Sequence, residues 1–210
     1  MVSIKLTDPI NVIENKINQA IADHINSVIA RQKERLTRKL KDSAYSWVGS
    51  QPEIDSLRSE GLPNSLNSQF GLRKGQGDSV VASIITAVVE STQINIKKLD
   101  KKLKGSIDFN FQPKDFQNLL SLPEGHVVTE KGADLHWLNW LLTRGDEAIV
   151  TNYQYVPSTD GRAGGGSMKA GGVFRVDPRF SGTLENNFIT RAFDGKQSEI
   201  SKLISDIINV

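Results

Sequence analysis

The sequence contains no cysteine among its 210 residues. It therefore has no disulfide framework, no thiolate metal site and no cysteine nucleophile. Long apolar runs are also missing, because the longest charge-free apolar stretch, residues 79–89, is shorter than the roughly 18–20 residues that a membrane-spanning helix needs. The first residues lack the apolar core of a signal peptide. We therefore expect a protein that is made in the cytoplasm, is not exported and does not enter a membrane.

An excess of either charge is absent as well, since 26 basic and 24 acidic residues give a net charge of +2. This balance is not the footprint of a dedicated nucleic-acid binder, although local basic patches are compatible with it. The length and the 38% of hydrophobic residues suffice for a hydrophobic core without stabilising cross-links. We expect a single α+β domain over residues 1–210.

The first segment has the start and stop signals of a long helix over about residues 8–48. Asp8 can cap it, Pro9 fits its first position, and Gly49 can end it. Apolar residues recur every three or four positions and form one stripe. They are Ile10, Ile13, Ile17, Ile21, Ile25 and Val28, followed less densely by Leu36, Leu40, Ala44 and Trp47. A helix of this length is unusual, so we expect a break near residues 30–33.

The second half of this helix is strongly basic. Its cations are Arg31, Lys33, Arg35, Arg38, Lys39 and Lys41, against Glu34 alone. Two interpretations fit this pattern: a solvated face, or a surface that faces nucleic acid or an acidic partner.

The rest of the chain alternates short helices and strands. Residues 50–77 are expected to hold two small helices in a connecting segment. Val and Ile pairs from Val80 to Val89 repeat every four residues, which predicts a helix although these residues prefer strands. Alternating patterns predict strands at 94–96, 107–111, 127–129, 148–156 and 174–176, and apolar spacing predicts a tryptophan helix at 133–143 and a C-terminal helix from Thr183 or Asn187. The predicted fold is α+β: a long N-terminal helix, a small antiparallel sheet of about four strands, a buried Trp-containing helix and a C-terminal helix.

Catalytic patterns are not found. His24, His126 and His136 fall in different segments without ligand spacing, and His24 lies near the apolar stripe, where a packed imidazole is expected. The glycine-rich residues 161–172 do not make a phosphate-binding loop, because Lys169 is followed by Ala and Gly. We interpret residues 160–172 as a loop, either ordered by a neighbouring subunit or forming a plain flexible tip. No catalytic, cofactor-binding or metal-ligating residues and no cofactor are predicted, so we do not expect an enzyme.

Several segments resemble one class of viral proteins. They are Trp137 to Gly145, Gly161 to Met168, Phe174 to Val176, Gly182-Thr183 and Asn187 to Ala192, with Ser56-Leu57 and Phe70 to Leu72 upstream. In this order they resemble virion structural proteins of tailed bacteriophages, of the neck and tail-completion kind. The resemblance implies a non-enzymatic α+β subunit that assembles into a hexameric or dodecameric ring at the head–tail junction of the virion. It further implies other neck, portal or tail proteins as partners and a DNA passage lined without sequence-specific contacts.

The resemblance and the residues together give a set of candidate contacts. We expect Trp137 and Trp140 to be largely buried, one in the core and one nearer a subunit contact. The candidate subunit-interface residues are Trp137, Trp140, Arg162, Met168 and Lys169. The candidate DNA-facing or partner-facing residues are Arg31, Lys33, Arg35, Arg38, Lys39 and Lys41. The alternative function is a nucleic-acid-binding or DNA-packaging accessory protein that uses residues 31–41.

Overall fold

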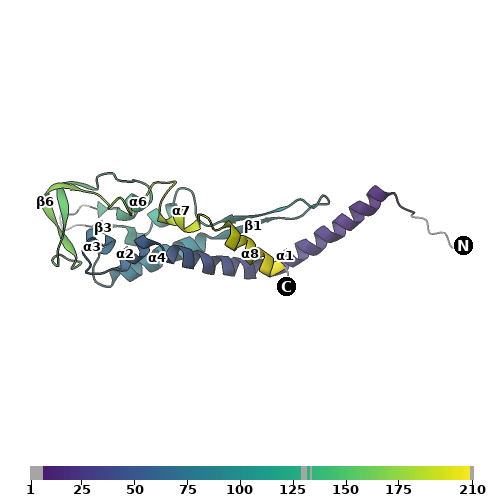
Figure 1. Ribbon diagram of the computed structural model, residues 1–210, viewed down its shortest axis with the longest axis horizontal. Coiled ribbons are helices and arrows are strands. Elements are labelled where there is room, and N and C mark those ends of the chain that lie inside the picture. The colour runs from purple at the N-terminus through teal and green to yellow at the C-terminus, as the bar shows by residue number, and fades with distance from the viewer. Residues whose placement is uncertain (1–6, 129–131, 133, 209–210) are drawn as a thin grey trace. The chain divides into compact units, whose positions relative to one another are not determined.

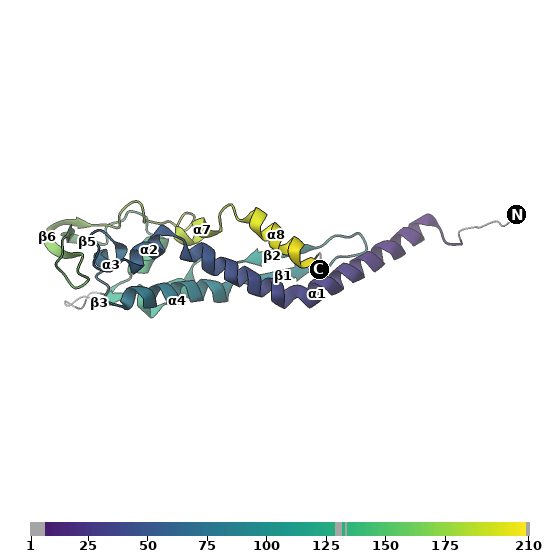
Figure 2. The ribbon, with the colours of Figure 1, turned by 60° about the horizontal axis from the view of Figure 1, so that its bottom comes forward.

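The computed structural model of the chain describes residues 7–128, 132 and 134–208. Its elements, shown in Figures 1 and 2, are α1 (Ile10–Gly49), α2 (Pro52–Arg58), α3 (Leu66–Gln69), α4 (Gln76–Ser91), β1 (Gln93–Lys97), β2 (Ser106–Asn110), α5 (Gln117–Leu120), the 3₁₀ turn η1 (Pro123–Gly125), β3 (Val127–Val128), β4 (Asp134–Leu135), α6 (Trp137–Leu142), β5 (Val150–Pro157), β6 (Gly166–Phe174), α7 (Phe188–Phe193) and α8 (Gln197–Ile208). Among the described residues, no helix has both the length and the apolar character needed to cross a bilayer.

Internal contacts group the chain into two compact units. Unit 1 takes its described residues from Met1–Leu40, Gln93–Asn110 and Ser198–Val210, and unit 2 from Lys41–Thr92 and Phe111–Gln197. The expectation of a single domain over residues 1–210 stays a prediction.

Unit 1 contains most of α1, the β1–β2 hairpin and α8. The two strands predicted from alternating residues are confirmed and form an antiparallel hairpin, with Ile94 opposite Phe109 and Ile96 opposite Ile107. Asn26 of α1 connects to the lysine-rich turn of this hairpin, because its side-chain amide donates to the carbonyl of Leu99 and its oxygen accepts the Leu99 N–H, at 3.0 and 2.9 Å.

The first helix is continuous from Ile10 to Gly49 (Figure 1), so the expected break near residues 30–33 is wrong. Residues 30–33 are Ala, Arg, Gln and Lys, which are among the best helix formers, and no proline or glycine interrupts residues 10–48. Length alone therefore gave no reason for a break.

Unit 2 is built around α4. Val80, Val81, Ile84, Ile85 and Val88 are all at most 1% exposed, so the helix predicted from their four-residue repeat is confirmed. Burial on one face outweighs the strand preference of these side chains. The connecting segment 50–77 holds the two small helices expected there, α2 and α3, and α2 packs against α4.

Among the described residues, the strands form three separate two-stranded antiparallel sheets: β1–β2, β3–β4 and β5–β6. The prediction of one sheet of about four strands is therefore wrong, although small antiparallel pairing is confirmed. Each strand pairs only with its neighbour in the chain, and helical segments separate one pair from the next.

The glycine-rich run is largely a strand and not a loop. Residues 166–174 form β6, which pairs with β5 from Pro157 opposite Gly166 to Val150 opposite Phe174. A register shift between Thr151 and Tyr153 accommodates Asn152, Gly171 and Gly172, all with positive φ. Pairing with β5 satisfies backbone groups of residues 166–174 within the chain, and contact of residues 160–172 with a neighbouring subunit stays a prediction.

Two of the glycines are required by close packing. A Cβ at Gly166 would lie 2.5 Å from the hydroxyl oxygen of Tyr155, and one at Gly165 would lie 2.6 Å from the carbonyl oxygen of Leu62. The Tyr155 hydroxyl donates to the Gly165 carbonyl at 2.8 Å and accepts the Asn64 N–H at 3.3 Å. The hairpin thus packs directly on the segment around α3, beside which it lies in Figure 2.

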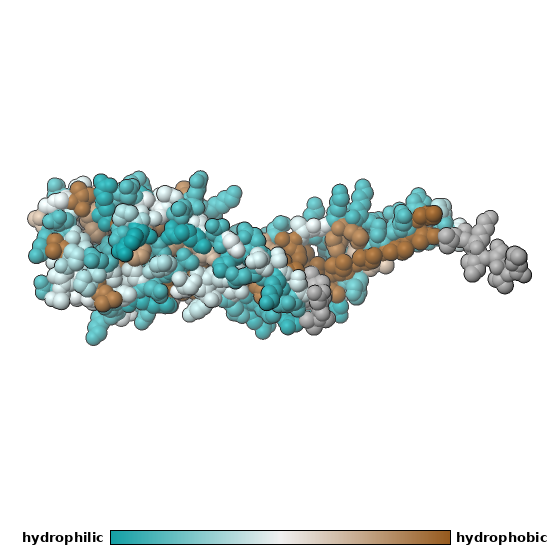
Figure 3. Space-filling view, viewed as in Figure 1, coloured by the Kyte–Doolittle hydropathy of each residue, from teal (hydrophilic) through white to brown (hydrophobic). Residues whose placement is uncertain are grey.

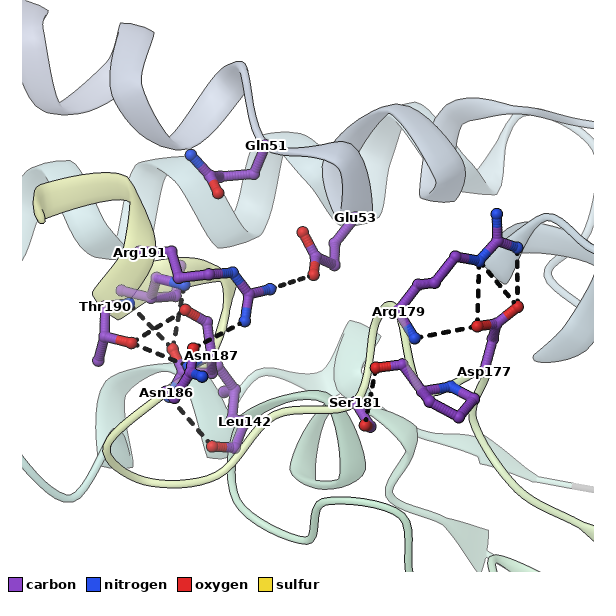
Figure 4. A network of polar contacts seen from close by, with 12 residues as sticks. Gln51, Glu53, Leu142, Asp177, Arg179, Ser181, Asn186, Asn187, Thr190 and Arg191 are labelled. Carbon is purple, nitrogen blue, oxygen red and sulfur yellow. Dashed lines mark hydrogen bonds and ion pairs between the residues drawn. The ribbon is translucent and has the colours of Figure 1, made fainter.

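The end of the chain forms two helices where one was predicted. Asn187 caps α7 with a capping box, in which its side chain accepts from the N–H groups of Ile189 and Thr190. Its amide also donates to the carbonyl of Leu142 at 3.1 Å, which ties α7 to α6 (Figure 4). Gly195, with φ of +71°, separates α7 from α8.

Candidate functional site

The N-terminal part of α1 exposes an apolar stripe. We give this name to Ile10, Ile13, Ile17, Ile21, Ile25 and Val28. Ile10, Ile17 and Ile21 are 68%, 52% and 40% exposed, and the other three are half-buried. Figure 3 shows hydrophobic side chains gathered along this part of the helix. A contiguous row of exposed apolar side chains is typical of a site that contacts another molecule.

The sequence predicted one apolar stripe along α1, whereas the structure shows two apolar faces with different exposure. The buried positions of α1 in unit 1 are Ala22, Leu36 and Leu40, at 0%, 4% and 0% exposure. At 3.6 residues per turn these positions lie about a quarter-turn away from the stripe. The helix therefore has one buried face and a second apolar face whose side chains are exposed or half-buried.

The apolar stripe continues into a basic face. From Val28, the same spacing of three and four residues leads to Arg31, Arg35 and Lys39, with Arg38 beside them. We call Arg31, Arg35, Arg38 and Lys39 the basic face. Its three arginines are exposed and Lys39 is half-buried.

The other two basic residues predicted on this helix, Lys33 and Lys41, lie off the basic face by the helical period. Lys33 is exposed and Lys41 half-buried. Within the described chain, none of the six predicted basic residues forms an ion pair. The sequence-predicted DNA-facing or partner-facing residues are thus uncompensated cations, four of them gathered on one side of α1.

The two tryptophans of α6 have different environments. Trp137 is 1% exposed and stacks on Phe70, with ring centroids 4.9 Å apart. Trp140 is half-buried. One tryptophan thus lies in the core and one nearer the surface, although positions three residues apart share one side of a helix and the difference does not come from opposite faces. Contact of either ring with another subunit stays a prediction.

The remaining predicted interface residues lie on the β5–β6 hairpin and its turn. Met168 is 39% exposed and Lys169 is exposed, at positions opposite Tyr155 and Gln154. Arg162 is exposed but engaged, because its Nε donates to the carbonyl of Gly71 at 2.8 Å. These three side chains therefore belong to an ordered hairpin, and Arg162 also fastens that hairpin to the segment after α3.

A cluster of metal-ligating side chains was missed by the sequence analysis. His126, Asp134 and His136 each place one ligand atom within 4.8 Å of those of the other two. The register of the β3–β4 hairpin brings them together, because Val127 pairs with Leu135 and the two histidines are the next residues outward. The sequence spacing His-x₇-Asp-x-His indicates a shared site only if the segments around His126 and His136 pair as antiparallel strands. His24, which was expected to pack, is exposed on α1.

A surface cavity of about 540 Å³ adjoins this cluster. His126 is part of its wall, together with Arg73, Lys74 and Arg162. In the described part of the chain, the cluster is the one group of three such side chains close enough to hold a cation together.

Comparison of the chain with protein-family models, with curated proteins and with solved structures gives no match.

Proposed function

We propose that this chain is a structural subunit of a tailed-phage virion, which assembles into a ring at the neck, joins the portal-bearing head to the tail and lines the DNA passage. The observation that carries an assembly role is the apolar stripe of α1, three of whose isoleucines are 40% or more exposed. A second chain that covered these side chains would remove apolar surface from water. The neck assignment is supported by the resemblance of residues 137–145, 161–168, 174–176 and 182–192.

The basic face supports the same proposal. Cations without ion-pair partners on one side of a helix attract phosphates and read no base sequence. Such a surface suits a protein past which DNA of any sequence moves. The role proposed is one of contact and not of catalysis, with a hexamer or dodecamer as the assembly and portal or tail proteins as neighbours.

The experiment is light scattering on the size-exclusion-purified full chain, together with negative-stain microscopy. We expect a closed oligomer with six or twelve copies. Ile17→Lys places a charge within the apolar stripe and should shift the mass towards the monomer. Asn15→Lys adds the same charge at an exposed position on the opposite side of the same helix and should leave the oligomer intact. A wild-type chain that is monomeric at every concentration would overturn the ring proposal, as would equal effects of the two variants.

The second candidate function is a nucleic-acid-binding or DNA-packaging accessory protein that uses residues 31–41. The specific observation in its favour is the set of six uncompensated basic residues there. Fluorescence anisotropy with duplexes of unrelated sequence separates this candidate from the first. A monomer that binds all duplexes tightly, and that loses about one unit of salt slope in Arg35→Gln but not in Lys101→Gln on the β1–β2 turn, would favour the accessory protein.

A further inference from the structure

We propose that His126, Asp134 and His136 form a Zn²⁺-binding site on the β3–β4 hairpin. The carboxylate of Asp134 lies close to both imidazoles: its Oδ2 is 3.3 Å from Nδ1 of His126 and 3.5 Å from Nε2 of His136. The two rings are themselves close, with centroids 3.6 Å apart. Three ligand groups thus converge on one small volume.

The spacing of these atoms suits a tetrahedral ion. Zn²⁺ binds imidazole nitrogen at about 2.0–2.1 Å and carboxylate oxygen at about 2.0–2.2 Å, which places neighbouring ligand atoms about 3.3–3.5 Å apart. Both nitrogen–oxygen distances fall in that range. The two nitrogens lie within 4.8 Å of each other, and a bound ion would require an imidazole rotation that brings them to the tetrahedral spacing. Space for that rotation exists, because the side chains of His126 and His136 are 26% and 50% exposed.

The backbone that carries the ligands is held by the core of unit 2. His126 follows Gly125, which is buried so tightly that a Cβ there would lie 3.1 Å from Cβ of Leu138. His136 precedes Trp137 and Leu138, each 1% exposed. Asp134 is placed by its pairing with Val128. The two histidines therefore flank residues whose positions are fixed by packing, which lowers the entropy lost when an ion binds.

The donor set selects the class of ion. Two imidazoles and one carboxylate suit Zn²⁺ and its transition-metal neighbours, whereas Mg²⁺ and Ca²⁺ prefer six or more oxygens. Three protein ligands leave a fourth position open to solvent, and water fills it in the isolated chain. A bound ion would cross-link the two strands of a hairpin that has only two residues in each strand, a length that is marginal by itself.

The test is isothermal titration of the untagged, full-length chain with ZnCl₂. We expect one Zn²⁺ per chain and no comparable binding of Mg²⁺. Asp134→Asn and His136→Asn should each weaken Zn²⁺ binding by about tenfold or more. His24→Asn removes an exposed histidine outside the cluster and serves as the matched control, with unchanged affinity.

A spectroscopic readout separates this site from adventitious binding. Co²⁺ in place of Zn²⁺ should give the intense visible bands of a four-coordinate ion in the wild type and in His24→Asn, and these bands should vanish in the His126→Asn/His136→Asn double variant. Circular dichroism should show an unchanged fold, because both ligands are partly exposed. The proposal is overturned if the wild type binds no Zn²⁺, if the double variant still binds one equivalent, or if the control loses as much affinity as His136→Asn. None of these outcomes depends on the oligomeric state, so the test is independent of the proposed function.

Discussion

At the residue scale, Glu53 stands out, because its side chain is buried at 1% exposure and carries a carboxylate. One terminal nitrogen of Arg191, in α7, donates to Oε1 of Glu53, and the other donates to Oδ1 of Asn186 (Figure 4). The other carboxylate oxygen, Oε2, has no hydrogen-bond partner among the described residues. Arg191 is therefore the principal compensation for a buried charge, and it links α2 to α7.

We predict that Arg191→Ala lowers the free energy of unfolding by about 3 kcal/mol, because removal of one partner leaves a buried charge without compensation. Denaturant unfolding monitored by circular dichroism measures this. Arg179→Ala is the control: Arg179 pairs with Asp177, but its side chain is 69% exposed. Its removal should have a far smaller effect, since exposed ion pairs contribute little. Equal losses in the two variants would contradict the assignment.

The pKa of Glu53 gives a second prediction at this scale. Burial of the carboxyl raises its pKa above the ordinary 4.5 and outweighs the hydrogen bonds and the charge of Arg191, which lower it. The folded state consequently binds this proton more tightly than the unfolded state. The stabilising contribution is complete below pH 4.5 and is lost as the pH rises through the folded-state pKa.

We therefore expect the wild-type free energy of unfolding, measured relative to Glu53→Gln, to fall as the pH rises from 4.5 towards neutrality. Parallel unfolding titrations of the two proteins over this range provide the measurement. A difference that stays constant, or that grows with pH, would show that burial does not dominate at this carboxyl.

At the element scale, the β5–β6 hairpin shows glycine acting through packing as well as through backbone freedom. We predict that Gly165→Ala costs about 1–3 kcal/mol of stability, because its methyl group would overlap the Ser68 side chain and approach the Leu62 carbonyl. Gly49→Ala is the matched control, since its Cβ would meet only Ile85 Cδ1 at an ordinary 3.7 Å within a helix. That change should be neutral or stabilising. Thermal unfolding of both variants measures the effect. A Gly165→Ala variant as stable as the wild type would refute the packing argument.

The elements that the sequence predicted well are those whose signal is periodic and local. The four-residue repeat from Val80 to Val88 predicted α4, and the alternation around Ile94 and Phe109 predicted the β1–β2 pair. The strand β6 escaped prediction because Gly166, Gly171 and Gly172 have no side-chain periodicity to read. β6 forms by pairing with β5, and the local sequence of β6 does not specify that pairing.

The candidate site divides in the same way. Exposure of the arginines on the basic face follows from charge, which the sequence displays directly. Convergence of His126 and His136 does not, because it depends on a two-residue strand pair whose register no local pattern specifies. The split of the isoleucines of α1 from its buried face was hidden for a related reason: both faces share the spacing of three and four residues, and only contacts tell them apart.

At the scale of the whole molecule, the chain combines a unit that carries a partly exposed apolar stripe with a second unit that holds most of the buried apolar side chains. The two proposed interactions of α1 differ in their physical origin. Apolar contacts between copies are not screened by salt, whereas phosphate contacts release counterions and weaken steeply.

We predict that raising the salt from about 50 mM to about 200 mM leaves the oligomer mass unchanged while DNA affinity falls by at least tenfold. Light scattering and anisotropy on the same samples measure the two quantities. Dissociation of the oligomer over this range would show that charge, and not the apolar stripe, holds the copies together.

The spacing of the apolar stripe has a geometric consequence. Ile10 and Val28 are 18 residues apart and are joined by five steps of three or four residues, an average of 3.6. This equals the natural period of a straight α-helix, whereas a heptad repeat averages 3.5 and winds its helices into a left-handed superhelix. The stripe therefore runs parallel to the helix axis without drifting around it. A helix of a second copy packed along the stripe would need no supercoil, so the two helices could pack side by side without winding around each other.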